Sequence, residues 1–430
     1  MDFLKKYPIA EISIHSLVLI AMYAALYFLG IFKVIPSLEN ISQWDTGWYS
    51  SIVKDGYSYI ENAQCNIAFF PLFPYLWKFT QLSVIGMSIL NYIFLCIGFT
   101  LLYRAFNLST KELFILLSTP SLFFCYVPYS EALFFLSCSI FLYGIQKEMS
   151  FLCIVGLGLA CLTRSVSILF IPGILFSWLL ITTSKNKMSH IRIIVYLLAT
   201  AIASTLLVNY IQYLETGVAF KLFEVQLQWG HIFSWPEFYL TTWDGVRLLW
   251  LDGLAFYTGI ICLLYCIYYS YDYFINKKTS PIHASYLFSL FYLAASTLVV
   301  FFYSGKDGAG GTSIYSLNRY IFATPFFSVF IIFLLRKTEV TRTHWMVLIL
   351  SSIVCWSFFG LFSQLNGLDY IFIPVIKTQQ YFALMTAYAF LYLLMTSKKT
   401  TPVIWYGVYL INIALQLFLL NSFIQGKWIG

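Results

Sequence analysis

Long apolar segments, separated by short polar stretches, follow one another along the whole chain. A helix that crosses a bilayer needs about 20 predominantly apolar residues. On this criterion we expect about 13 transmembrane or re-entrant helices, near 14–32, 83–103, 112–125, 131–146, 150–163, 166–183, 193–212, 254–272, 284–303, 319–335, 344–362, 380–397 and 403–424. The third, fourth and fifth are too short to cross alone, which predicts tilted, broken or re-entrant helices packed against protein or water.

The amino-acid composition also indicates a helical membrane protein. The chain has 430 residues, of which 60% are hydrophobic and only 10% charged, whereas soluble domains carry about 25% charged residues. We therefore expect an all-α polytopic membrane protein that forms a single domain over residues 1–430. The net charge of +7 is explained by basic residues flanking the helices, so we expect membrane lipids as partners and no nucleic acid.

The distribution of Lys and Arg predicts the topology. If the N-terminus is cytoplasmic, the short loops on that side are basic, as the positive-inside rule requires. The long loops, about 33–82, 213–253, 304–318 and 363–379, then lie outside the cytoplasm and hold many of the acidic residues. The first two are long enough for interfacial helices, and 69–82, with Trp77 and Lys78, suits one. Function is therefore expected on the extracytoplasmic face.

The first external loop contains the most unusual polar segment, Gln43-Trp44-Asp45-Thr46-Gly47-Trp48-Tyr49. A carboxylate between two tryptophans at the membrane surface is partly desolvated, which makes it a stronger general base. The alternative is an interfacial Asp that caps a helix, with the tryptophans in the aromatic belt. We favour the catalytic interpretation because of the motifs that surround Asp45.

Together, these motifs resemble the PIG-V family of GPI mannosyltransferases and its bacterial relatives. They are Trp44-Asp45-x-x-Trp48-Tyr49, Asp55-Gly56-Tyr57, Phe69-Phe70-Pro71-Leu72-Phe73-Pro74, Pro128-Tyr129-Ser130-Glu131, Leu162-Thr163-Arg164-Ser165, Gln226-x-x-Trp229-Gly230, Trp235-Pro236 and Asn318-Arg319-Tyr320. The first block is specific, whereas the later ones are individually weak and support the likeness through their order. After about residue 330 only generic helices remain.

The resemblance implies a GT-C fold with its active site at the extracytoplasmic surface. It also implies a polyprenyl- or dolichyl-phosphate-mannose donor, with Asp45 as the acidic residue that acts on the acceptor. The chemistry is consistent with this, because an anionic lipid phosphate is already a good leaving group and a single base suffices to deprotonate the acceptor hydroxyl. Direct attack inverts the anomeric carbon.

Three cations are candidates for binding the donor phosphate: Arg319, Arg164 and Lys306. Arg164 can also be a snorkelling residue at a helix end, and Lys306, in Gly305-Lys306-Asp307-Gly308, can be part of a solvated turn. Glu131 starts an apolar helix and is either favoured there by the helix dipole or part of the pocket. The residues that we expect to shape the pocket or contact sugar and lipid are Trp44, Trp48, Tyr49, Tyr57, Tyr129, Glu131, Gln226, Trp229 and Tyr320.

No metal-binding spacing is recognisable. The nine cysteines lie mostly in apolar runs, where cysteine packs as a small hydrophobe. Asp45, Asp55 and Glu61 are hard oxygen ligands, but their spacing matches no known metal loop. We therefore expect no tightly bound cofactor or metal, with a divalent cation as the less favoured alternative.

Two other functions stay open. One is a GT-C transferase that uses another polyprenyl-phosphate sugar. The other is a lipid or sugar transporter (flippase), which is disfavoured because transporters place ionisable residues near the bilayer midplane and often contain repeats. We expect a bacterial plasma-membrane enzyme whose acceptor is a glycolipid, a glycan or a protein.

Overall fold

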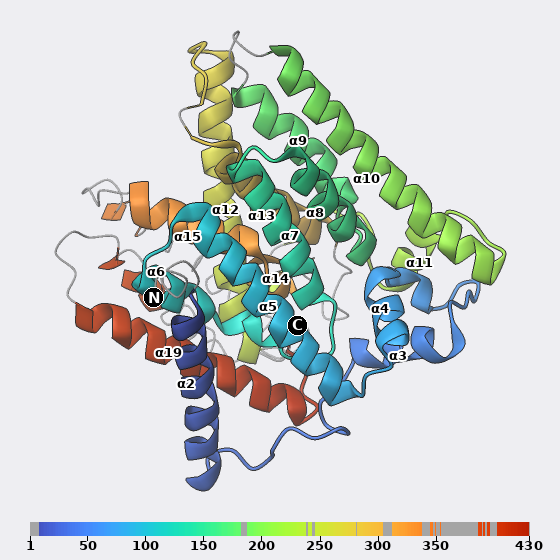
Figure 1. The fold of residues 1–430 in the computed structure, drawn as a ribbon, viewed down its shortest axis with the longest axis vertical. Helices are drawn as coiled ribbons and strands as arrows, with labels where there is room; N and C mark the ends of the chain where they lie inside the picture. Colours follow the sequence, from blue (N-terminus) through green and yellow to red (C-terminus); the bar gives the residue numbers. More distant parts are fainter. Residues whose placement is uncertain are drawn as a thin grey trace.

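In the computed structural model the residues described are 8–181, 187–237, 240–242, 246–280, 282–303, 312–337 and 402–429, with a few short pieces between 345 and 395. They are mainly helical (Figure 1). The expected helices 344–362 and 380–397 lie largely outside the described residues, as do the loop 363–379 and Lys306.

Within these residues, six helices are long and apolar enough to cross a membrane. They are α2 (Ile9–Phe28), α5 (Val84–Phe106), α10 (Lys187–Thr216), α12 (Val246–Phe274), α13 (Ala284–Phe302) and α19 (Pro402–Ile424). Four shorter apolar helices pack among them: α7 (Glu131–Gln146), α8 (Ser150–Thr163), α9 (Ser167–Ile181) and α15 (Pro325–Lys337). The chain is thus an all-α, multi-pass membrane protein, as expected.

Two expected helices are interrupted, each just before a proline. The segment 112–125 divides into α6 (Thr110–Leu117) and the 3-10 helix η2 (Pro120–Cys125), so the prediction of a broken helix there is confirmed. The segment 319–335, expected as one helix, instead forms α14 (Leu317–Phe322) and α15. Proline has no backbone N–H, so it cannot continue the hydrogen bonding of the preceding helix. It is favoured in the first turn of the next helix, where no such bond is needed.

The antiparallel pair α7 and α8 is held together by close backbone contact. A Cβ built on Gly156 would lie 2.4 Å from the backbone nitrogen of Phe141, and one on Gly144 would lie 2.7 Å from that of Cys153. Small residues let apolar helices approach closely. Since the two helices have similar lengths, the N-terminus of α7 and the C-terminus of α8 meet at the same end of the bundle.

The helix ends gather at two opposite ends of the bundle. At one end, Thr110 donates to Glu11 (3.1 Å), and Arg336 pairs with Glu112 (2.9 Å) and donates to the carbonyl of Phe106 (2.5 Å). The first turn of α2, the last residue of α5, the first turn of α6 and the last turn of α15 therefore share one side, as the predicted topology requires.

Short helices gather at the other end: α3 (Asp45–Asp55), α4 (Leu72–Thr80), α11 (Leu222–Gln228) and the 3-10 helix η1 (Asn66–Ala68). Figure 1 shows α3, α4 and α11 grouped beyond the end of α10. An interfacial helix was expected at 69–82, and α4 occupies most of that range. The expected loop 213–253 is shorter than predicted, because α12 already begins at Val246.

Candidate active site

Asp45 is the first residue of α3. The alternative of an Asp that caps the helix is not what the structure shows, because the N-cap is Trp44 and has no side-chain cap bond, although the helix dipole does favour a carboxylate in the first turn. Trp44 precedes it with a φ of 50°, a left-handed conformation that is uncommon for a residue other than glycine. The N–H of Asp45 donates to the hydroxyl of Tyr129 (3.3 Å), and its carboxylate is only 16% exposed. The backbone of Asp45 is thus held by Tyr129, and its carboxylate is largely shielded from solvent.

Arg319 links this carboxylate to a second one. Its Nη2 lies 2.6 Å from Oδ2 of Asp45, and its Nε donates to Oε1 of Glu131. The guanidinium also stacks over the ring of Tyr129, with 4.7 Å between Cζ and the ring centroid. Its side chain is 6% exposed. Burial alone would lower the pKa of Arg319, but the two carboxylates hold it well above its ordinary value.

Arg164 completes the cluster by binding the same oxygen of Glu131 as Arg319 does. It follows the last residue of α8, and its Nη1 donates to the same Oε1 of Glu131. Its guanidinium lies over the ring of Tyr320, 5.3 Å from the centroid. Two arginines and two carboxylates therefore balance in charge, which limits the cost of burying them. This group of Asp45, Glu131, Arg164 and Arg319 is called the charged cluster below.

The charged cluster retains unused hydrogen-bonding capacity. Among the described residues, Oδ1 of Asp45 and Nη1 of Arg319 have no hydrogen-bond partner. A carboxylate oxygen can accept a proton from a hydroxyl group, while guanidinium N–H groups match phosphate oxygens. In the described part of the chain, the cluster thus combines a free acceptor oxygen with a free guanidinium N–H group.

Several predicted pocket residues lie beside the charged cluster or pack on one another. The hydroxyl of Tyr49 donates to Ser130 (2.8 Å), directly before Glu131, while Tyr129 and Tyr320 lie under the two guanidinium groups. Trp48 contacts Trp229, which directly follows α11, and their ring centroids are 5.2 Å apart. These residues come from parts of the chain that were predicted to lie together.

Other predicted residues lie elsewhere. The hydroxyl of Tyr57 donates to the carbonyl of Phe69 (2.8 Å) and its N–H to Glu215 (2.5 Å), so it fastens the first loop to α10. Gln226 lies on α11 and accepts backbone bonds from Trp229 and His231 through its carbonyl. Lys306 is outside the described residues.

Three residues near the charged cluster were not proposed as site residues from the sequence, although Asn318 belongs to the motif Asn318-Arg319-Tyr320. Asn318 adjoins Arg319 and binds the buried carboxylate of Asp252. Trp428, near the C-terminus, packs edge-to-face on Trp44 with centroids 5.0 Å apart. Asp252 carried a recognisable signal, because it is an ionisable residue inside an apolar stretch.

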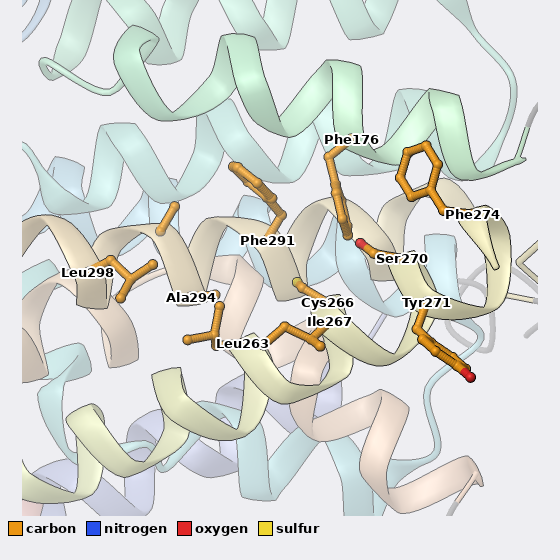
Figure 2. A pocket seen from close by; sticks show the side chains of 11 residues that line it. Phe176, Leu263, Cys266, Ile267, Ser270, Tyr271, Phe274, Phe291, Ala294 and Leu298 are labelled. Carbon is orange, nitrogen blue, oxygen red and sulfur yellow. The ribbon is translucent and has the colours of Figure 1, made fainter.

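An apolar cavity of about 480 Å³ lies between α9, α12 and α13 (Figure 2). Figure 2 shows Phe176, Phe291 and Phe274 around it, together with Leu263 and Leu298. Leu263 is about 16 Å further along α12 than Asp252 at 1.5 Å per residue, and no member of the charged cluster lines the cavity. The cavity suits an apolar chain, not a sugar or a phosphate.

Within the described residues, no group of three or more His, Cys, Asp or Glu side chains is arranged to hold a metal ion. The eight described cysteines are free, and all except Cys96 are buried. Their packing role is as predicted.

No family model matches the chain, and no curated protein matches it either. Among solved structures, it is similar to the crystal structure of ArnT from Cupriavidus metallidurans bound to undecaprenyl phosphate, at a TM-score of 0.47 and 10% identity. The match covers 96% of this chain and 77% of ArnT. A likeness at this level leaves the function to be argued from the residues of the site.

Proposed function

We propose that this protein is a membrane-embedded glycosyltransferase of the GT-C type. In this proposal it transfers mannose from a polyprenyl-phosphate-mannose donor to a hydroxyl of a glycolipid, glycan or protein acceptor. The observation that carries the proposal is the ion pair between Asp45 and Arg319, in a balanced charged cluster at one end of a membrane bundle. Such a site places a base next to a binding group for an anion.

The proposed reaction is a single displacement. The acceptor hydroxyl oxygen attacks the anomeric carbon of the donor, the bond from that carbon to the phosphate oxygen breaks, and polyprenyl phosphate leaves with the bonding electrons. The hydroxyl proton passes to Oδ1 of Asp45 and then to water. The anomeric configuration inverts, and no general acid is needed because the leaving phosphate is already a stable anion.

Arg319 and Arg164 are the proposed phosphate ligands, through N–H groups not used by Glu131 and Asp45. They would stabilise the charge that grows on the departing phosphate oxygen. A phosphate bound to Arg319 would also compete with Asp45 for the guanidinium, which strengthens the carboxylate as a base. Lys306 remains a proposed third ligand on the basis of its position in the sequence.

Two parts of the proposal, mannose as the transferred sugar and an extracytoplasmic active site, rest on the motifs that resemble the PIG-V family. We propose a bacterial plasma-membrane protein with a cytoplasmic N-terminus. A GT-C transferase for another polyprenyl-phosphate sugar is the alternative. A transporter fits less well, because the four charges lie together where helices α3, α7 and α14 begin and α8 ends, instead of in the middle of a span.

The direct test is to incubate the purified protein with radiolabelled polyprenyl-phosphate-mannose and membrane extract, and to identify the labelled product. Parallel reactions with polyprenyl-phosphate donors of other hexoses and of pentoses establish the sugar. Transfer from another donor alone would replace mannose in the proposal. A protein that is folded and transfers none of these sugars, yet moves the intact lipid across vesicle membranes, would support the transporter instead.

A further inference from the structure

A second buried carboxylate, Asp252, lies in the second turn of α12 and is fully buried. Its Oδ1 accepts hydrogen bonds from both the backbone N–H (2.9 Å) and the side-chain amide (2.8 Å) of Asn318. Its Oδ2 accepts from the hydroxyl of Thr242 (2.7 Å). No cation pairs with it within the described residues. A buried carboxylate is costly unless it is hydrogen-bonded, so these contacts define where Asn318 lies.

The hydrogen bond from the backbone N–H of Asn318 to Asp252 is important because Asn318 belongs to the short helix α14. Asn318 is in the first turn of α14, where N–H groups have no partner within the helix. Ser316, at the N-cap of α14, has a φ of 64° and makes no capping bond through its side chain. Asp252 therefore caps α14 from a different helix, a role that the N-cap side chain usually performs.

Arg319 is the next residue along α14. This helix has only six residues and ends just before Pro325, so it has little stability of its own. Asn318 is also held on its other side, because its Oδ1 accepts from Ser121 (3.0 Å) in η2. The position of the Arg319 backbone thus depends on contacts made by Asn318.

We propose that Asp252 is a positioning residue for Arg319. It holds the first turn of α14 and thereby sets the guanidinium of Arg319 between Asp45 and Glu131. The inference rests on the proposed function, since it treats Arg319 as a ligand of the donor phosphate. A displacement of about 1 Å at such a group can reduce a rate about 100-fold, so Asp252 is expected to affect transfer without touching the donor.

The kinetic test compares Asp252→Ala and Asp252→Asn with Thr258→Ala in the full-length protein. Thr258 is a matched control, because it is also buried on α12 but, within the described residues, its hydroxyl bonds to the carbonyl of Leu254 in the same helix. With polyprenyl-phosphate-mannose varied, we expect Asp252→Ala to raise the donor KM at least about tenfold. Asp252→Asn keeps an acceptor for the N–H of Asn318 and should restore most of the loss, and Thr258→Ala should leave the KM unchanged.

A double-mutant cycle separates positioning from a general loss of stability. If Asp252 acts through Arg319, its substitution should change the donor KM little in an Arg319→Lys background, so the two effects are not additive. Fully additive effects, or an unchanged donor KM for folded Asp252→Ala, would overturn the proposal. Should Asp252→Ala fail to fold, Asn318→Ala takes its place. It removes the side-chain half of the contact together with the hydrogen bond from Ser121, but keeps the backbone N–H bond to Asp252. It should raise the KM by a smaller factor, and no rise would again overturn the proposal.

A third measurement needs no substrate. Asp45 and Asp252 have no hydrogen bond with each other, and Asn318 and Arg319 connect them. Thermal unfolding of Asp45→Asn, Asp252→Ala and the double variant should therefore give non-additive shifts in Tm. Non-additivity in a protein that transfers no sugar would refute the proposed function but retain the positioning role. Additive shifts would refute the positioning role alone.

Discussion

Nη2 of Arg319 lies 2.6 Å from Oδ2 of Asp45, although 274 positions separate the two residues in the sequence. The same guanidinium bonds to Oε1 of Glu131, and Arg164 bonds to that same oxygen. Each of these residues is placed by a different helix end. The candidate active site is therefore formed by four chain segments that meet at one end of the bundle.

Asp45→Asn is expected to remove transfer activity. The amide keeps the shape of the side chain but cannot accept the proton, and loss of a general base lowers kcat by roughly 100- to 10,000-fold. Transfer is measured per folded protein, with Glu39→Gln as the control, because Glu39 is an exposed acid in the same loop. Undiminished kcat in folded Asp45→Asn would exclude Asp45 as the base.

Arg319→Lys is expected to raise the donor KM. Lysine has one ammonium group in place of a planar fork, so it cannot bind Asp45, Glu131 and a phosphate in the same geometry. A loss of about 1.4 kcal/mol corresponds to a tenfold weaker affinity.

Arg336→Lys is the matched control for this variant. Arg336 makes a similar forked contact with Glu112 at the other end of the bundle. Its substitution should lower Tm slightly and leave the donor KM unchanged. Equal changes in KM for both variants would mean that Arg319 acts through overall stability.

Gly156→Ala is expected to destabilise the protein. The added Cβ would lie 2.4 Å from the nitrogen of Phe141, so α7 and α8 must move apart. Overpacking of this kind typically costs about 1–3 kcal/mol, and it should also shift Arg164 relative to Glu131. Gly158→Ala is the control on the same helix, because its Cβ would meet Thr200 at an ordinary 3.4 Å. Thermal unfolding of both variants checks the prediction, which fails if the two Tm values are equal.

Acidification is expected to remove the stabilising contribution of Glu112. Burial would raise its pKa, but the hydrogen bonds from Arg336 and Ser109 outweigh burial and lower the pKa below the ordinary 4.5. The unfolded state therefore binds a proton more readily than the folded state. The contribution is complete above the ordinary value and is lost as the pH falls through the lower folded value.

Glu112→Gln tests this directly. The difference in Tm between the native protein and this variant should be present at neutral pH and shrink in the acid range below 4.5. The effect is modest, since Arg336 is 35% exposed and solvent weakens such pairs. A difference in Tm that stays constant across the pH range would contradict the assignment.

Much of the helix pattern could be predicted from the sequence. The segments 131–146 and 150–163 match α7 and α8 residue for residue, because the polar groups at both ends of each apolar run mark where the helices stop. The segment 319–335 was not predicted correctly, although Pro325 lies within it. Its overall hydrophobicity favours one helix, but Pro325 cannot continue the hydrogen bonding of a preceding helix, and α14 packs separately against α12 and η2.

For the site, prediction was uneven. Asp45, Glu131, Arg164 and Arg319 were each proposed from local motifs, and the structure brings them together. Tyr57 was proposed in the same way, but its hydroxyl is occupied by the carbonyl of Phe69. Whether a polar side chain faces a site or fastens a loop depends on neighbours far along the chain, and a motif does not record them.

The sequence by itself determined that this chain enters a membrane as a bundle of helices and which of its charges are unusual there. Whether a segment can cross a membrane depends on the summed hydrophobicity of its consecutive residues, and this sum can be calculated for each segment from the sequence alone. Only the tertiary structure decided that Arg319 bridges Asp45 and Glu131, and that Asp252 caps the helix which carries Arg319. Ion pairs and hydrogen bonds depend on distances of about 3 Å between remote segments, and these distances exist only once the helices have packed.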